Sequence, residues 1–169
     1  QPHCPLFIQL GLVAIFRVLS FIKHFFISGN EHRLHSPFLF SLYINVIRKP
    51  KITENTKAED FRSWLLKNKE QIDEIDFGTG NKHQQQIFRI AQGSLKSKKE
   101  YLFLANLAHF LQPKNILELG TCFGLSTSYL KEGASHSNIT TLEGNPNRLH
   151  IANTLINQYE GINSVAGNI

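Results

Sequence analysis

The sequence predicts an α/β protein, a partial doubly wound (Rossmann-like) parallel sheet preceded by a helical N-terminal extension. Residues 115–119, NILEL, have the apolar character of a short buried strand, and helical and strand patterns alternate after it with short connections. Such an alternation gives parallel strands joined by right-handed crossovers. Because 41% of the 169 residues are apolar, the chain can bury one ordinary core. We expect the extension over residues 1–70 and the N-terminal half of the sheet domain over 71–169.

The extension is predicted to contain three helices. Residues 5–16 are uncharged but too few for the roughly 20 residues of a membrane span. From Ile15 onward an amphipathic helix is expected to pack on the domain or on a partner, with a membrane anchor as the lesser alternative. Ser36-Pro37 opens a second helix that runs to about Ile47, and a third covers residues 57–69.

The domain is predicted to alternate between strands and helices from residue 72 to residue 167. IDEIDF is expected to be a strand or extended segment, and HQQQIFRIAQ a polar helix. A stronger helix over 98–111 precedes NILEL, and a helix over 125–132, a strand over 138–143, a helix over 146–159 and a strand over 162–167 follow it. With no further strands after Ile169, NILEL would be an exposed apolar edge, so we expect the N-terminal portion of a longer protein.

The loop after NILEL carries groups suited to an amino-acid-like ligand. Gly120 allows a close approach to the backbone, and Gly124 begins a helix whose free N–H groups can bind an anion. Ser126 adds a hydroxyl donor for a carboxylate. Glu118 would repel a pyrophosphate but suits an ammonium group. S-adenosylmethionine carries an ammonium group, a carboxylate and a ribose.

The next two strands end in groups that suit the ribose and the adenine of this ligand. Glu143 ends its strand nineteen residues after Gly124, where a carboxylate accepts both hydrogens of a ribose diol. The G-x-G-x-x-G fingerprint of NAD sites is not present. Counted from Gly120, its second and third glycines would fall at Cys122 and Leu125. The third strand ends in Gly167-Asn168, where the side-chain amide is suited to hydrogen-bond the edge of the adenine ring. The series therefore predicts an S-adenosylmethionine site.

The segments KNILELGTCFGLSTSYL and ITTLEGNPNRLHIA resemble the first two cofactor motifs of class I S-adenosylmethionine-dependent methyltransferases. The resemblance is closest to the catechol O-methyltransferase-like branch and covers residues 98–169. It implies methylation of an oxygen of a small-molecule acceptor, with a divalent metal bound by residues beyond Ile169. No catalytic residue or metal ligand is assigned within the chain, which we expect to be inactive on its own. The cofactor residues that the resemblance and the loop chemistry indicate are Glu118, Gly120, Thr121, Gly124, Ser126, Glu143, Gly144 and Asn168.

Several alternatives stay open at this point. EIDFGTG at 74–80 also has the form of a cofactor loop, but no second strand with a terminal acid follows it, so a structural turn is favoured over a flap above the pocket. The net charge of +5 is spread along the chain, which argues against a nucleic-acid partner. Cys4 and Cys122 suggest neither a disulfide framework nor a zinc site and fit a reducing cytoplasm. Cys122 is interpreted as filling the loop rather than as a reactive thiol. A homodimer and a non-catalytic, methyltransferase-like binding module remain compatible with the sequence.

Overall fold

The computed structural model describes Arg17 and residues 19–23, 36–75 and 80–167. The chain divides into two compact units, residues 1–40 and 41–169. In the first unit, Arg17 and residues 19–23 are helical, as predicted, and the rest of the expected amphipathic helix lies outside the described residues. Helix α2 (Pro37–Leu42) starts where predicted, since the Leu39 N–H donates to the Ser36 hydroxyl at 3.4 Å. No helix within the described ranges is long and apolar enough to cross a membrane.

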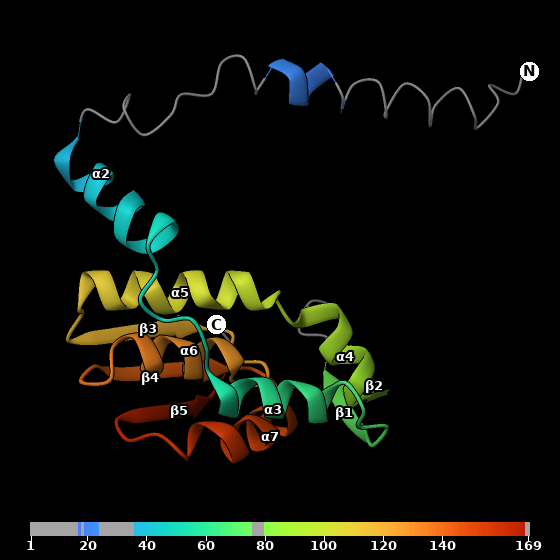
Figure 1. Ribbon diagram of the computed structural model, residues 1–169. Helices are drawn as coiled ribbons and strands as arrows, with labels where there is room; N and C mark the ends of the chain where they lie inside the picture. Colours follow the sequence, from blue (N-terminus) through green and yellow to red (C-terminus); the bar gives the residue numbers. More distant parts are fainter. Residues whose placement is uncertain (1–16, 18, 24–35, 76–79, 168–169) are drawn as a thin grey trace, which may run out of the picture. The chain divides into compact units, whose positions relative to one another are not determined.

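The second unit contains a three-stranded parallel sheet in the order β3-β4-β5. Its strands are β3 (Asn115–Leu119), β4 (Asn138–Glu143) and β5 (Ile162–Ala166). Helix α6 (Leu125–Gly133) connects the first two, and α7 (Pro146–Ile156) connects the last two (Figure 1). This topology confirms the predicted α/β class and the partial doubly wound sheet.

The two faces of the sheet differ in burial. On β4, Ile139, Thr141 and Glu143 are buried, and they share the face against which α6 and α7 pack. The opposite face carries Leu117, which is 67% exposed, and Leu119, which is 58% exposed. Among the described residues, the helices that connect the strands therefore cover one face only.

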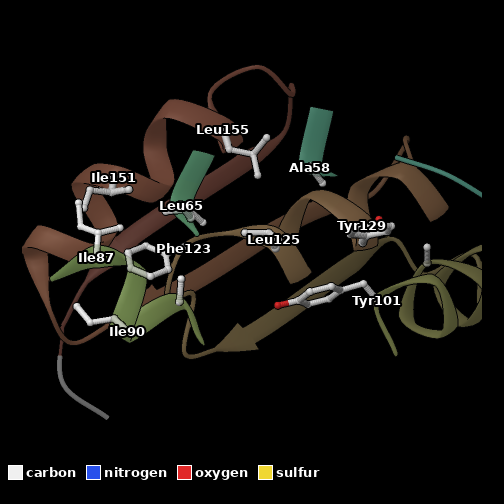
Figure 2. Packing of buried hydrophobic residues seen from close by; sticks show 12 residues of the cluster. Ala58, Leu65, Ile87, Ile90, Tyr101, Phe123, Leu125, Tyr129, Ile151 and Leu155 are labelled. Atoms are coloured by element: carbon white, nitrogen blue, oxygen red, sulfur yellow. The ribbon is translucent and has the colours of Figure 1, made fainter. Parts of the chain in front are cut away.

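A cluster of buried apolar residues lies between the helices and the loop after β3 (Figure 2). Helix α5 (Lys98–Leu111) has the predicted bounds and packs along α6, where the ring of Tyr101 stacks on that of Tyr129 at a centroid distance of 5.4 Å. Helices α3 (Thr56–Leu65) and α4 (Ile87–Ser94) complete the cluster. Phe123 lies close to Ile87 and Ile90 of α4, so the core holds the loop after β3 in place.

A β-hairpin precedes α4 and corrects one sequence-based prediction. β1 (Gln71–Ile75) pairs with β2 (Lys82–Gln86) in antiparallel register. The helix predicted over 83–92 is thus wrong for residues 83–86, which extend along β1, with Gln84 Nε2 donating to Asp73 at 3.1 Å. This polar run lacks apolar periodicity, so its partner strand determines its conformation. EIDFGTG accordingly spans the hairpin connection, of which residues 76–79 lie outside the described ranges.

Other helix boundaries differ from prediction by a few residues. Helix α3 ends at Leu65 rather than at residue 69, and α7 ends at Ile156 rather than at residue 159. The helix that starts at Pro37 continues beyond α2 as a π-helix, Tyr43–Arg48.

Candidate functional site

The carboxyl ends of the three parallel strands lie at one edge of the sheet. The N–H groups of Gly120 and Thr121 both donate to the carbonyl of Leu142, at 2.8 and 3.0 Å. The Gly167 N–H donates to the Glu143 carbonyl at 2.9 Å. The loops that follow β3 and β5 therefore flank the end of β4. The structure brings most of the predicted site residues to this edge, while Asn168 lies outside the described residues.

Glu143 is the central acidic group of this edge. Its side chain is almost buried, at 7% exposure, and it joins two loops. Oε2 accepts a hydrogen bond from the Cys122 N–H at 2.7 Å, and Oε1 accepts one from the Asn145 N–H at 3.0 Å. Because each carboxylate oxygen has two lone pairs, both oxygens can still accept hydroxyl hydrogens. The carboxylate is thus oriented by the backbone and remains able to bind a diol.

Glu118 lies on the helix-covered face of β3, where threonine hydroxyls hold its carboxylate. Oε2 accepts from Thr127 at 2.5 Å and from Thr141 at 2.7 Å. The hydroxyl of Thr121 is 2.6 Å from that of Thr141 and is buried. The Thr121 side chain therefore belongs to the packing between β3 and β4, and only its backbone lies on the loop. The contact of Glu118 with an ammonium group stays a prediction.

Glycine suits the two loop positions, 120 and 124, for different structural reasons. Gly120 has a φ of 90°, and a Cβ added to it would have open space around it. Gly124 has a φ of 77°, but an added Cβ would lie 2.8 Å from Ile156 Cγ2. Gly120 thus leaves the backbone accessible to a ligand, whereas Gly124 allows α6 to approach α7 closely.

Cys122 adopts a left-handed backbone conformation with a φ of 50°. This conformation explains why glycine is the usual residue at the corresponding position of related nucleotide-binding loops. The thiol lies 3.3 Å from the hydroxyl of Ser94, at the end of α4. Burial raises the pKa of the Cys122 thiol, and the hydrogen bond with Ser94 partly opposes this effect. A thiol in this state is weakly nucleophilic, in agreement with the loop-filling interpretation.

The start of α6 completes the candidate site. Gly124 is its N-cap, and Ser126 is half-buried in the first turn. The first N–H groups of a helix lack partners within the helix and attract anions. These N–H groups suit the carboxylate of S-adenosylmethionine, as Glu143 suits its ribose and Glu118 its ammonium group. The residues present are chemically compatible with this cofactor, and their contacts with it stay predictions. Within the described ranges, no three His, Cys, Asp or Glu side chains are grouped to hold a metal ion.

Two of the cavities that the described residues form lie away from the three strand ends. The larger, about 500 Å³, is an apolar groove between the π-helix and α5, lined by Val46, Leu102 and Phe103 among others. The smaller, about 370 Å³, is lined mainly by polar residues and lies between the hairpin and Asn147 of α7. The strand-end chemistry, rather than cavity size, identifies the candidate site.

Four residues near this edge were not predicted from the sequence as site residues. Asn145 is the N-cap of α7, and its oxygen accepts from the Asn147 N–H at 2.9 Å. An asparagine followed by a proline is typical of a helix N-terminus, so the sequence signal for a capping role of Asn145 was present. Ser94, Glu74 and Arg148 contact partners that are distant in the sequence, so no local pattern indicates them.

No protein-family model matches the chain, and no curated protein matches it either. Solved structures do resemble it. The O-methyltransferase from Bacillus cereus in complex with SAH shares 21% identity at a TM-score of 0.47, covering 77% of this chain and 50% of that one. The SAH-bound methyltransferase PaMTH1 from Podospora anserina shares 16% identity at a TM-score of 0.53, covering 83% of this chain and 53% of that one. The chain spans about half the length of these structures. Together with its sheet topology, the likeness to PaMTH1 shows that this chain has a partial Rossmann-like methyltransferase fold.

Proposed function

We propose that the chain is the cofactor-binding part of an S-adenosylmethionine-dependent methyltransferase that methylates an oxygen of a small molecule. The observation that carries this proposal is Glu143. Its carboxylate lies at the end of the second parallel strand and is oriented by the N–H groups of Cys122 and Asn145. The fold shared with an SAH-bound methyltransferase supports the same cofactor.

The chain would contribute to the reaction by holding the cofactor in position. When bound, S-adenosylmethionine supplies an electrophilic methyl group on a sulfonium, which an acceptor oxygen attacks in line as the carbon–sulfur bond breaks. Glu143 would accept the two ribose hydroxyls, and the first turn of α6 with Ser126 would bind the carboxylate. Glu118 would face the ammonium group. Holding the reactants in line removes much of the entropic barrier of such a displacement. Removal of the acceptor proton, and any divalent metal, is assigned to residues outside this chain.

Calorimetric titration with S-adenosylhomocysteine (SAH) tests the proposal. We expect binding by the wild-type protein and, in Glu143→Ala, a loss of affinity of about 10- to 100-fold, because hydrogen bonds to a charged group are removed. Glu160→Ala is the control, since Glu160 is exposed in the turn before β5. Thermal unfolding checks that each variant is folded. Absence of binding at high micromolar SAH, or unchanged binding by Glu143→Ala, would contradict the proposal.

A second candidate is a non-catalytic binding module, which the exposed leucines on the open face of β3 favour because they offer a surface for another protein. A binding module that keeps the half-fold can also bind SAH, so methyl transfer separates the two candidates. We expect the full-length protein to methylate a hydroxyl-bearing small molecule. The 169-residue chain, in which we assign no acceptor-activating residue, is expected to bind SAH without turnover, and turnover by this chain alone would contradict that expectation.

A further inference from the structure

The β1–β2 hairpin lies against the turn that follows β4. A two-stranded hairpin is marginally stable by itself, so contacts to the rest of the unit must hold it. Strand β2 cannot supply them through apolar packing, because its residues, KHQQQ, are polar and mostly exposed. Ile72 of β1 packs against the core cluster, and the polar groups of β1 contact the first turn of α7.

Glu74 and Arg148 form the strongest of these contacts. Arg148 Nε donates to Glu74 Oε1 at 2.9 Å, and Arg148 Nη2 donates to Oε2. The side chains are 4% exposed for Glu74 and 29% exposed for Arg148, so the pair is largely shielded from water. A bidentate pair fixes direction as well as distance, because the guanidinium is planar. It therefore locks the start of α7 onto β1.

Asn145 connects the hairpin to the ribose-binding carboxylate. Its Nδ2 donates to the Asp73 carbonyl at 3.1 Å, and its backbone N–H donates to Glu143 Oε1 at 3.0 Å. Asn147 Nδ2 donates to the same Asp73 carbonyl at 3.0 Å. The turn that contains Asn145 and Asn147 thus binds the hairpin through its side chains and orients the Glu143 carboxylate through a backbone N–H.

We propose that the β1–β2 hairpin positions Glu143 for the cofactor ribose, with Glu74 and Arg148 as positioning residues. Neither residue needs to touch the ligand. Their ion pair and the Asp73 carbonyl fix Asn145, and the Asn145 N–H then holds the carboxylate at the angle that a diol requires. This inference rests on the proposed function, because it assigns the hairpin a role in that same site.

The test is the affinity for SAH of the folded Glu74→Gln variant. We expect a loss of roughly 10-fold, which lies within the range typical of residues that act on a site through a network. Glu59→Gln is the matched control. It breaks another partly buried ion pair, Glu59–Arg62 at 3.2 Å on α3. Glu59 also accepts a hydrogen bond from the Tyr129 hydroxyl of α6 at 2.7 Å, which a glutamine oxygen can still accept. We expect this control to lose stability but to keep its affinity.

A double-mutant cycle distinguishes positioning from general destabilisation. In a Glu143→Ala background, adding Glu74→Gln should cause no further loss of affinity, because the carboxylate that is positioned is no longer present. The charge swap Glu74→Arg with Arg148→Glu should recover most of the affinity. If Glu74→Gln does not fold, Arg148→Lys makes the same test, since it keeps the charge but not the bidentate geometry.

The outcomes separate the two proposals. Absence of SAH binding by the wild-type protein would overturn the proposed function and this inference with it. If the wild-type protein binds SAH and folded Glu74→Gln or Arg148→Lys binds equally well, only the hairpin inference is overturned. Additive losses in the double-mutant cycle would also overturn it.

Discussion

The backbone of Cys122 lies in the left-handed region, at a φ of 50°, so the loop after β3 carries local strain at this residue. A side chain in this conformation costs about 1–2 kcal/mol, and a β-branched side chain fits it worst. We therefore predict that Cys122→Val lowers the free energy of unfolding by about 1–2 kcal/mol. Cys122→Gly should change it by less than about 1 kcal/mol, because relief of strain offsets the greater freedom of the unfolded chain. Urea denaturation measures both, and equal stability of the two variants would contradict the prediction.

The pKa of the Cys122 thiol gives a second prediction at the scale of one residue. Burial raises this pKa, so less of the reactive thiolate is present at pH 8 than in a free cysteine. In a Cys4→Ser background, labelling by a thiol-specific disulfide reagent should be slow, and its pH midpoint should lie above that of a free thiol. The folded state also binds the proton more tightly than the unfolded state. This stabilisation is complete below the unfolded pKa, about 8.5, and is lost as the pH rises through the folded pKa. Rapid labelling with a midpoint below that of a free thiol would contradict the assignment.

The contact between α5 and α6 depends on a glycine at the end of α6. A Cβ added to Gly133 would lie within 2.0 Å of the Ala105 carbonyl oxygen, a backbone atom that cannot move aside without shifting α5. We predict that Gly133→Ala lowers the free energy of unfolding by about 1–3 kcal/mol, as overpacking does.

Gly93→Ala is the matched control for Gly133→Ala. Gly93 is also helical, in α4, but an added Cβ meets no atom within 4 Å. The alanine there should raise the free energy of unfolding by about 0.5–1 kcal/mol, because it improves helix propensity. Thermal or urea unfolding of both variants gives the comparison. A Gly133→Ala variant as stable as the wild-type protein would show that α5 and α6 are not packed as the structure describes.

An element or site residue could be predicted from the sequence where a short segment of the chain determines its structure. Helix α5 was predicted with its observed bounds because its apolar residues recur with helical spacing before Pro113. Glu143 was predicted because a parallel strand that ends in an acid can be read from a short segment. The polar run at 83–86 carries no such spacing, and its strand partner determined its structure. The Glu74–Arg148 ion pair joins residues 74 positions apart, so only the folded chain reveals it.

The molecule as described leaves one face of its parallel sheet open. Parallel sheets in folded proteins have both faces covered, yet Leu117 and Leu119 are more than half exposed here. Val165 of β5 is also exposed on the described surface. Strand β3 is moreover an edge of the sheet, with backbone groups available for pairing. An apolar face beside an open edge favours association with another protein segment.

We predict that the 169-residue chain associates with itself through this face. Sedimentation velocity should show a larger species as the concentration rises, and the Leu117→Gln, Leu119→Gln double variant should sediment as a monomer. Because both leucines are exposed, the double variant should unfold with a free energy within about 1 kcal/mol of the wild-type value. Leu66→Gln is the control, since Leu66 is also exposed but belongs to the end of α3 rather than to the sheet. A discrete wild-type dimer that the double variant abolishes would place the homodimer at β3. Association that persists in the double variant would place it on another surface.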